Sequence, residues 1–209
     1  MKRRKKRTAD LVLNLCMVFF SVIALFPLCW VFLTAFQPTG QGVSFVLPDI
    51  LAKGFTLKNF TRVSELIPLW QNFWNSVVVS VTGTVLTLFF CALAGYAFAK
   101  FRFPGRDALF LLLLFTMVIP QEVCIVPLFV VMRKLGWIDN MLSLIIPRAA
   151  TAVGIFYMRQ YISQYPTEII EQARIDGCRE FSIFCRIVVP GITPALASWG
   201  AISLIARWN

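Results

Sequence analysis

Long apolar runs set the first limit on how this chain can fold. Residues 11–36 form the first run, which is broken only by Asn14, Ser21, Pro27 and Thr34. Crossing the hydrocarbon core of a bilayer takes about 20 apolar residues in a helix. The composition agrees, because 58% of residues are hydrophobic and 14% are charged, against roughly 25% charged in soluble domains. We therefore expect a membrane protein without a soluble domain.

Five apolar runs predict an all-α membrane protein, a polytopic helix bundle in one transmembrane domain over residues 1–209. A lipid-exposed segment must satisfy its own backbone hydrogen bonds, which favours helices. The expected spans are residues 11–36, 73–99, 108–132, 141–158 and an incomplete fifth run from about residue 187.

Helix-breaking prolines and small residues occur within some of these spans. Pro120 and Pro127 lie in the third run, and Pro147 and Gly154 interrupt the fourth. Proline within a helix removes a hydrogen bond and bends it. The second run ends in small residues such as Gly95, which let helices approach closely in lipid.

Lysine and arginine predict the orientation. With the N-terminus inside the cell, thirteen basic residues lie in inside segments and five lie in outside segments. Basic residues are enriched in cytoplasmic loops. We therefore expect residues 1–10 to be cytoplasmic, 37–72 to be extracytoplasmic and 159–187 to be cytoplasmic. The first run is longer than the 7–15 residues of a signal-peptide core, so we expect it to be retained as a span.

Several other function classes find little support. The net charge of +10 arises from basic residues between apolar runs, so it reflects topology and not nucleic-acid binding. The six cysteines form no C-x-x-C pair and the chain has no histidine, so neither a metal site nor a disulfide framework is expected. We predict no catalytic residue, no cofactor and no metal.

The segment 166–190 carries the functional prediction. Pro166 suits a helix start, and we expect a helix from there to about Ile175. Asp176 and Gly177 then favour a turn, because glycine adopts positive φ readily. A second helical stretch should run to Arg186, before Pro190. From the residues alone, its many apolar side chains fit either a partner surface or the membrane interface.

This segment resembles the coupling loop of ATP-binding-cassette (ABC) importer permeases, whose pattern is E-A-A-x3-G-x9-I-x-L-P. Gln172 and Val189 depart from the pattern. The residues that match it, together with the neighbouring turn aspartate, are Glu171, Ala173, Asp176, Gly177, Ile187 and Pro190.

Further segments are similar to carbohydrate-importer permeases of the maltose-permease type, and to the shorter of the two membrane subunits in that family. They read FTLKNF at 55–60, NS at 75–76, AGYAFAKFRFPGR at 94–106, VPLFVVMRKLGWIDN at 126–140, YMRQY at 157–161 and WN at 208–209. That family usually has six spans, so a sixth is expected beyond the five visible here.

The resemblance implies a permease subunit in a bacterial inner membrane, with a sugar or related solute as cargo. It implies ABC ATPase subunits, a second homologous permease and an extracytoplasmic solute-binding protein as partners. This chain would not hydrolyse ATP, and it contains no G-x-x-x-x-G-K-[ST] phosphate loop. Glu171 would pair with the ATPase by charge, and Asp176 with Gly177 would set the loop shape.

Three charges fall within the expected spans, namely Glu122, Arg148 and Arg207. Each would cost about 2.5–3.5 kcal/mol at a lipid-facing helix centre. Glu122 and Arg207 fall near the outer ends of spans, where their charged groups can extend to the membrane surface. Arg148 is the deepest, and we expect it to form a structural ion pair or to line the translocation path.

Two other function classes remain alternatives from the residues. An ion-coupled secondary transporter would show internal repeats with paired broken helices, and no convincing repeat is visible. A non-transporting membrane scaffold would leave the coupling pattern unexplained.

Overall fold

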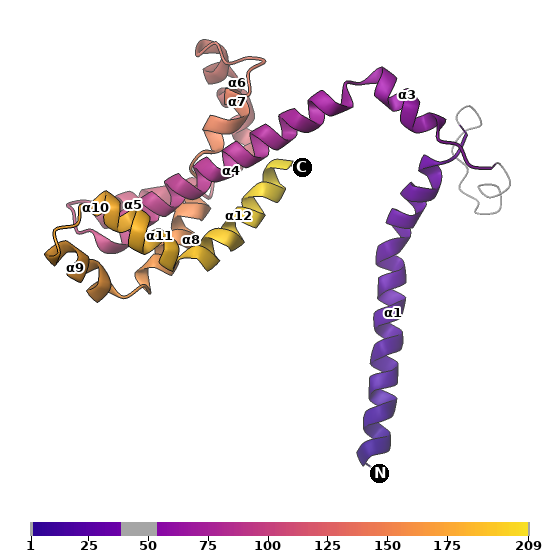
Figure 1. The fold of residues 1–209 in the computed structure, drawn as a ribbon, viewed down its shortest axis with the longest axis horizontal. Helices are drawn as coiled ribbons and strands as arrows, with labels where there is room; N and C mark the ends of the chain where they lie inside the picture. The colour runs from indigo at the N-terminus through magenta and orange to yellow at the C-terminus, as the bar shows by residue number, and fades with distance from the viewer. Residues whose placement is uncertain (1, 39–53, 209) are drawn as a thin grey trace. The chain divides into compact units, whose positions relative to one another are not determined.

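The structure, a computed structural model, describes residues 2–38 and 54–208, with side chains from residue 10 onward. The described residues contain helices and no strand (Figure 1). The chain divides into two compact units, Met1–Trp70 and Gln71–Asn209.

The described residues of the first unit form one long helix and a short one. Helix α1 spans Lys2–Ala35 and contains Pro27, and helix α3 spans Lys58–Leu66. The amide of Asn59 donates to the carbonyl oxygens of Ala35 and Gln37, at 2.8 and 2.7 Å. A helix end leaves carbonyls without intrahelical partners, so the start of α3 caps the end of α1. Much of the expected 37–72 loop, residues 39–53, lies outside the described residues.

The second unit is built on α4, Leu69–Lys100, a single unbroken helix. It begins four residues before the predicted second span and ends one residue after it. A Cβ added at Gly95 would lie 2.7 Å from Met158 Cβ. The small residue therefore allows the close approach of two helices that the sequence predicted.

The third predicted span is not one continuous helix. Helix α5 spans Arg106–Thr116, the 3-10 turn η1 spans Gln121–Cys124 and α6 spans Ile125–Lys134. The helices before and after the break are bent by 90°. Pro120 precedes η1, and the residue before a proline is disfavoured in the helical region. The kink expected from the prolines within 108–132 is thus a complete break, which makes this segment a broken span or a re-entrant segment.

The fourth predicted span is also bent. It contains α7 at Leu142–Ile145, the 3-10 turn η2 at Ile146–Arg148 and α8 at Ala152–Ser163, with a 44° bend before α8. Thr151 caps α8, since its Oγ1 accepts from the Gly154 N–H at 3.2 Å. Helix α8 continues five residues past the predicted end of the span, into the segment 159–187.

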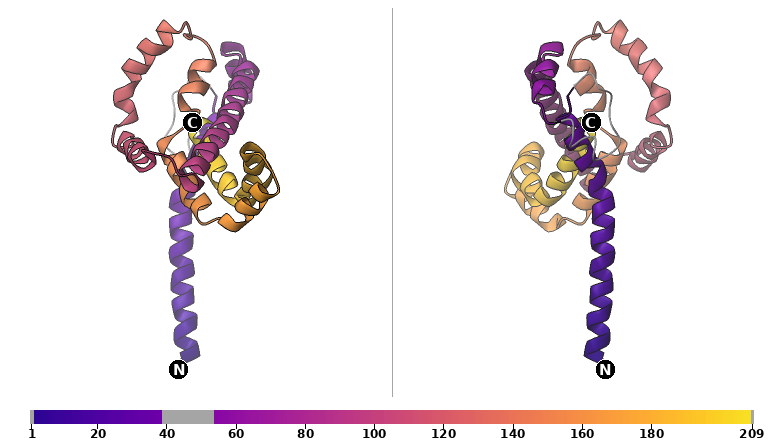
Figure 2. Two further views of the ribbon diagram at one scale, coloured as in Figure 1. Left: turned by 90° about the vertical axis from the view of Figure 1, so that its left-hand side faces the viewer. Right: turned by 90° about the vertical axis from the view of Figure 1, so that its right-hand side faces the viewer.

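The remaining helices are α9 at Thr167–Ile175, α10 at Glu180–Ile183, the π-helix η3 at Phe184–Val188, α11 at Val189–Gly191 and α12 at Thr193–Trp208. Pro190 does not end the second helical stretch as expected, because helix continues to Gly191. An 80° bend precedes α12, so the fifth span helix starts at Thr193 and not near residue 187. Both views in Figure 2 show α9 to α11 as a lobe to one side of α4.

The helices account for the predicted number of spans. Two described helices, over Asp10–Ala35 and Leu69–Lys100, are long and apolar enough to cross a bilayer alone, and three bent pairs raise the total to as many as five. The prediction of an all-α polytopic membrane protein is confirmed.

Candidate functional site

A glycine-terminated helix end shapes the centre of the segment 166–190. The Cys178 N–H donates to the carbonyl oxygen of Ala173 and the Gly177 N–H to that of Arg174, each at 3.0 Å. Gly177 has φ +79°. This is a Schellman motif, in which a residue with positive φ follows the helix and satisfies its last carbonyls. The predicted helix and turn are confirmed, and two pattern residues, Ala173 and Gly177, belong to one hydrogen-bonded motif.

The pattern residues divide into inward and outward groups. Ala173 is buried and Ile187 is half-buried, while Glu171, Asp176, Gly177 and Pro190 are exposed. Beside the turn, Ile175 is 85% exposed. The outward residues therefore present charge, backbone and an apolar side chain at the surface, whereas Ala173 and Ile187 pack toward the protein.

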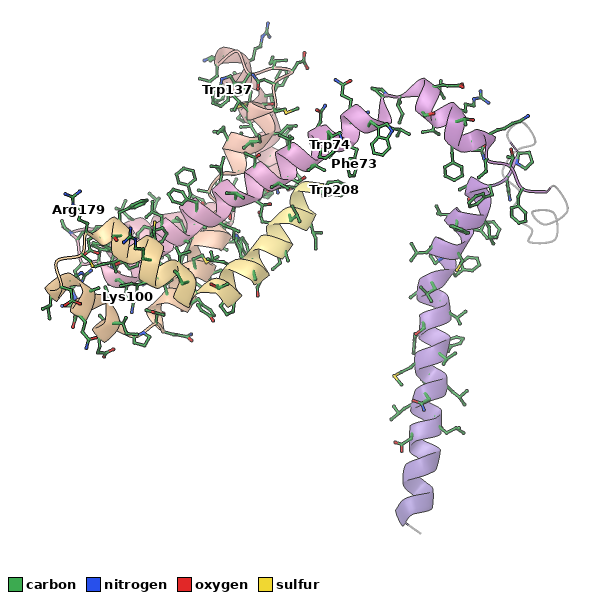
Figure 3. All side chains as sticks on the ribbon, in the orientation of Figure 1. Phe73, Trp74, Lys100, Trp137, Arg179 and Trp208 are labelled. Carbon is green, nitrogen blue, oxygen red and sulfur yellow. The ribbon has the colours of Figure 1, made fainter. Side chains whose placement is uncertain are left out.

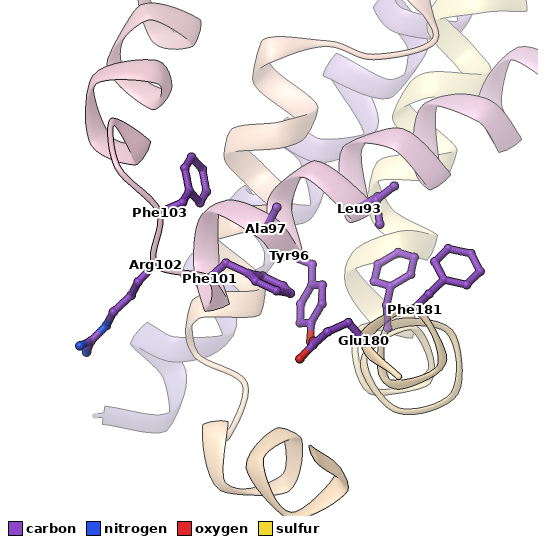
Figure 4. A pocket seen from close by; sticks show the side chains of 9 residues that line it. Leu93, Tyr96, Ala97, Phe101, Arg102, Phe103, Glu180 and Phe181 are labelled. Atoms are coloured by element: carbon purple, nitrogen blue, oxygen red, sulfur yellow. The ribbon is translucent and has the colours of Figure 1, made fainter. Parts of the chain in front are cut away.

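An ion pair joins α9 to α10 across the turn. Arg174 Nε lies 2.5 Å from Glu180 Oε1, and this hydrogen bond raises the pKa of the Arg174 guanidinium. The hydroxyl of Tyr96, on α4, donates to Glu180 Oε2 at 3.1 Å. Figure 4 shows the Tyr96 ring directed at the Glu180 carboxylate. Two helices of the segment are thus fixed to each other and to α4.

Lys100, the last residue of α4, holds the start of α9. Its Nζ donates to the Tyr165 carbonyl oxygen at 2.5 Å and to Thr167 Oγ1 at 2.9 Å; Figure 3 labels its position. Sequence reasoning assigned no role to Tyr96, Lys100, Arg174 or Glu180. A signal was present, since Tyr96 and Lys100 are four apart on one helix face at the end of a predicted span.

Apolar packing makes α10, η3 and α11 one firm block. Ile183, Phe184 and Val188 are almost fully buried, in the same core as Met158 and Ile162 of α8. The helix widens before Pro190, and the Val189 N–H donates to the carbonyl of Phe184, five residues back. π-helical turns of this kind occur often at functional sites.

An aromatic groove lies beside this block. A cavity of about 410 Å³ is bounded by the end of α4, the following loop and α10 (Figure 4). Its lining residues are Leu93, Tyr96, Ala97, Phe101, Arg102, Phe103, Glu180, Phe181 and Phe184. Phe181 is 59% exposed, so the groove adds apolar surface on the same lobe as the exposed turn.

The three charges of the predicted spans have different surroundings. Glu122 is exposed in η1 and makes no ion pair within the described residues. Arg148 is also exposed, and within the described residues its guanidinium makes one hydrogen bond, to Gln121 Oε1 at 3.4 Å. The expected ion pair of Arg148 is not formed inside the described chain. Arg207 is the half-buried one, and its Nη2 donates to the Arg148 carbonyl oxygen at 2.6 Å.

Comparisons with known proteins identify the family to which this arrangement of helices belongs. A family model described as the binding-protein-dependent transport system inner membrane component matches residues 90–209, which include the whole of the segment 166–190. The chain belongs to this family. It is a non-catalytic permease subunit of an ABC importer, and this excludes the secondary-transporter and scaffold alternatives.

Named relatives align with nearly all of the permease. It is 35% identical to the arabinooligosaccharides transport system permease protein AraQ of Halalkalibacterium halodurans, over 100% of this chain and 76% of the relative. It is 30% identical to the lactose transport system permease protein LacG of Rhizobium radiobacter, over 98% of this chain and 74% of the relative.

A solved structure has the same fold. It is a bacterial ABC transporter involved in the import of the acidic polysaccharide alginate, with a TM-score of 0.83 and 29% identity over 99% of this chain and 72% of that one. The resemblance stated from the sequence is thereby confirmed. Membership of the family also implies a multi-pass membrane location, an ATPase and a solute-binding protein in general terms.

Proposed function

We propose that this permease carries a carbohydrate, and that it is driven by an ATPase docked on residues 166–190. The names of similar proteins support the solute class, since they refer to arabinooligosaccharides, lactose and diacetylchitobiose. These are all sugars of more than one unit. The permease would act with a second homologous permease and an extracytoplasmic solute-binding protein.

The exposed Schellman turn is the observation that carries the docking proposal. Glu171 and Ile175 are exposed on α9, and Gly177 turns the chain beside them. An exposed apolar side chain beside a carboxylate that forms no ion pair within the described residues fits contact with a protein partner better than contact with water. Because Tyr96 bonds to Glu180 and Lys100 bonds to the start of α9, a displacement of the turn would be transmitted to α4, a membrane helix.

The proposed orientation places the N-terminus and residues 159–187 in the cytoplasm of a bacterial cell. Its support is the excess of lysine and arginine in those segments. The described side chains of α1 are almost all exposed and apolar, which suits a span that meets lipid or the second permease. An ATPase that uses cytoplasmic ATP can reach the turn only in this orientation.

Uptake by the reconstituted importer tests the solute class. Proteoliposomes would contain both permeases and the ATPase, with the solute-binding protein outside and ATP within. We expect uptake of at least one of radiolabelled arabinotriose, lactose and diacetylchitobiose, and none of radiolabelled glutamine. Uptake of glutamine with none of the sugars would contradict the proposal, as would sugar uptake driven by a sodium or proton gradient without ATP.

Replacement of Glu171 tests the docking. A hydrogen bond to a charged group contributes about 1.5–3 kcal/mol, so Glu171→Ala should weaken ATPase binding by about tenfold or more. Insertion in the membrane should be normal, because Glu171 is exposed. Glu168→Ala, on the same helix and also exposed, is the matched control. Equal ATPase affinity for Glu171→Ala and the unmodified permease, measured in detergent, would remove Glu171 from the proposed interface.

A further inference from the structure

Helix α3, in the first unit, has a charged side and an apolar side. Lys58, Arg62 and Glu65 follow one another at spacings of four and three, which places them on one side of a helix. Phe60 and Val63 are three apart and, at 3.6 residues per turn, lie on the opposite side. Helices with two such sides lie at a boundary between water and an apolar phase.

The apolar side of α3 is largely uncovered. Phe60 and Val63 are 50% and 42% exposed, and Leu57 and Leu66, at the two ends of the helix, are 67% and 72% exposed. All nine residues of α3 are described, and none of them is buried. Apolar surface gathered on one side of an element indicates contact with a partner or with a membrane, so the question is which of the two covers it.

The start of α3 is fixed to the end of the membrane helix α1. The amide of Asn59 bonds to two carbonyl oxygens there, as described above. The ring of Phe36 lies between those of Phe32 and Phe60, with centroid separations of 5.1 and 5.3 Å. Figure 1 shows the two helices meeting at the end of α1 away from the N-terminus. Because Phe32 is 65% exposed on α1, the apolar side of α3 continues the exposed aromatic surface of a span.

The length of α1 places this junction at the level of the lipid headgroups. Its apolar part, Asp10–Ala35, has 26 residues, which extend about 39 Å at 1.5 Å per residue. The hydrocarbon core of a bilayer is about 30 Å thick, so the end of α1 extends past it. Helix α3 therefore begins in the interfacial layer, where an amphipathic helix buries its apolar side among the upper parts of the acyl chains.

We infer that α3 is an interfacial helix that lies in the membrane surface beside α1, with phospholipid covering Phe60 and Val63. Continuity with the exposed aromatic surface of α1 favours lipid over a protein partner. Charge favours it too, because Lys58 and Arg62 have side chains long enough to reach lipid phosphates from the polar side. Such a helix would fix the depth of the end of α1 in the bilayer.

Fluorescence quenching tests this placement. Val63→Cys and Glu65→Cys would be made separately in a permease without the six native cysteines and labelled with a nitrobenzoxadiazole dye. Each would be assembled into the complete importer in vesicles of phosphatidylethanolamine and phosphatidylglycerol. We expect the label at residue 63 to lose most of its fluorescence when the lipids carry a nitroxide near the headgroup end of an acyl chain, and to respond little to aqueous iodide. The label at residue 65, on the opposite side of the same helix, is the matched control and should show the reverse.

Four results would overturn the inference. Quenching at residue 63 by iodide and not by nitroxide lipid would mean that the apolar side faces water. Quenching by neither would mean that another subunit of the importer covers it. Emission at residue 63 that changes when the solute-binding protein is added, without quenching by nitroxide lipid, would make that protein the occupant. Equal quenching by nitroxide lipid at residues 63 and 65 would mean that α3 is inserted in the bilayer and does not lie at its surface.

Discussion

At the scale of single residues, Gly177 illustrates how backbone conformation alone constrains the segment 166–190. Its φ is +79°, yet a Cβ added there would meet no atom within 4 Å. Substitution would therefore act through backbone strain and not through a clash. Positive φ costs other residues about 1–2 kcal/mol, and β-branched residues are the least tolerant.

Gly177→Val should insert normally and fold its spans, but lose ATPase binding and sugar-stimulated ATP hydrolysis. The measurements are copurification of the ATPase and its hydrolysis rate in the reconstituted importer. Gly136→Val is the control, because Gly136 also has positive φ, at +69°, and open space around its Cβ position. Gly177→Asn should keep most of the activity, because asparagine tolerates this conformation. Full activity of Gly177→Val would show that the shape of the turn is not needed.

At the scale of elements, side-chain hydrogen bonds hold the segment 166–190 to α4. The Tyr96 hydroxyl bonds to Glu180, and the Lys100 ammonium bonds to the residues that begin α9. The start of α9 and the start of α10 are thus connected to the same transmembrane helix. We expect a partner that moves the turn to tilt α4 with it, because Cys91 and Ala92 of α4 share one packed core with α10 and η3.

The bond between Tyr96 and Glu180 should be measurable as a coupling energy. Tyr96→Phe, Glu180→Gln and the double variant form a double-mutant cycle, for which we expect about 1 kcal/mol, since the carboxylate is partly exposed. Amide hydrogen exchange in α9 should then be about fivefold faster in each single variant. Tyr157→Phe, which stacks on Trp199, is the control. A coupling energy of zero would mean that Tyr96 does not hold the segment.

At the scale of the whole molecule, topology decides which surfaces an ATPase and a solute-binding protein can reach. Within the described residues, two single helices and three bent pairs allow up to five crossings. Residues 159–187, after four crossings, then lie on the same side as the N-terminus.

Thiol labelling in intact cells checks this topology. In a permease without native cysteines, Lys58→Cys should react with an impermeant reagent added outside, because we expect residues 37–72 to be extracytoplasmic. Lys5→Cys and Glu180→Cys should react only after permeabilisation. Labelling of Glu180→Cys but not Lys58→Cys in intact cells would reverse the orientation and remove the docking proposal with it.

The features predicted from sequence are those that neighbouring residues decide. The apolar runs determined the number of spans, because transfer into lipid depends on local composition. The helix of residues 166–175 and the turn at Gly177 followed from local backbone preferences. The positions of breaks within the helices were harder to predict from the sequence. Pro120 and Pro190 carry the same signal, yet the helical residues stop before the first, while the helix includes the second and ends at Gly191, where an 80° bend leads into α12.

Tertiary structure alone decided which distant groups meet. Arg207 bonds to Thr87 across 120 positions, and Tyr96 bonds to Glu180 across 84. Sequence reasoning treated Arg148 as the deepest charge. Packing instead brings Arg207 to the Arg148 carbonyl and leaves the Arg148 guanidinium exposed in this chain. Hydropathy describes one segment at a time, and it contains no information on which faces of two helices touch. Those pairings depend on side-chain packing between helices, which exists only once the spans have assembled.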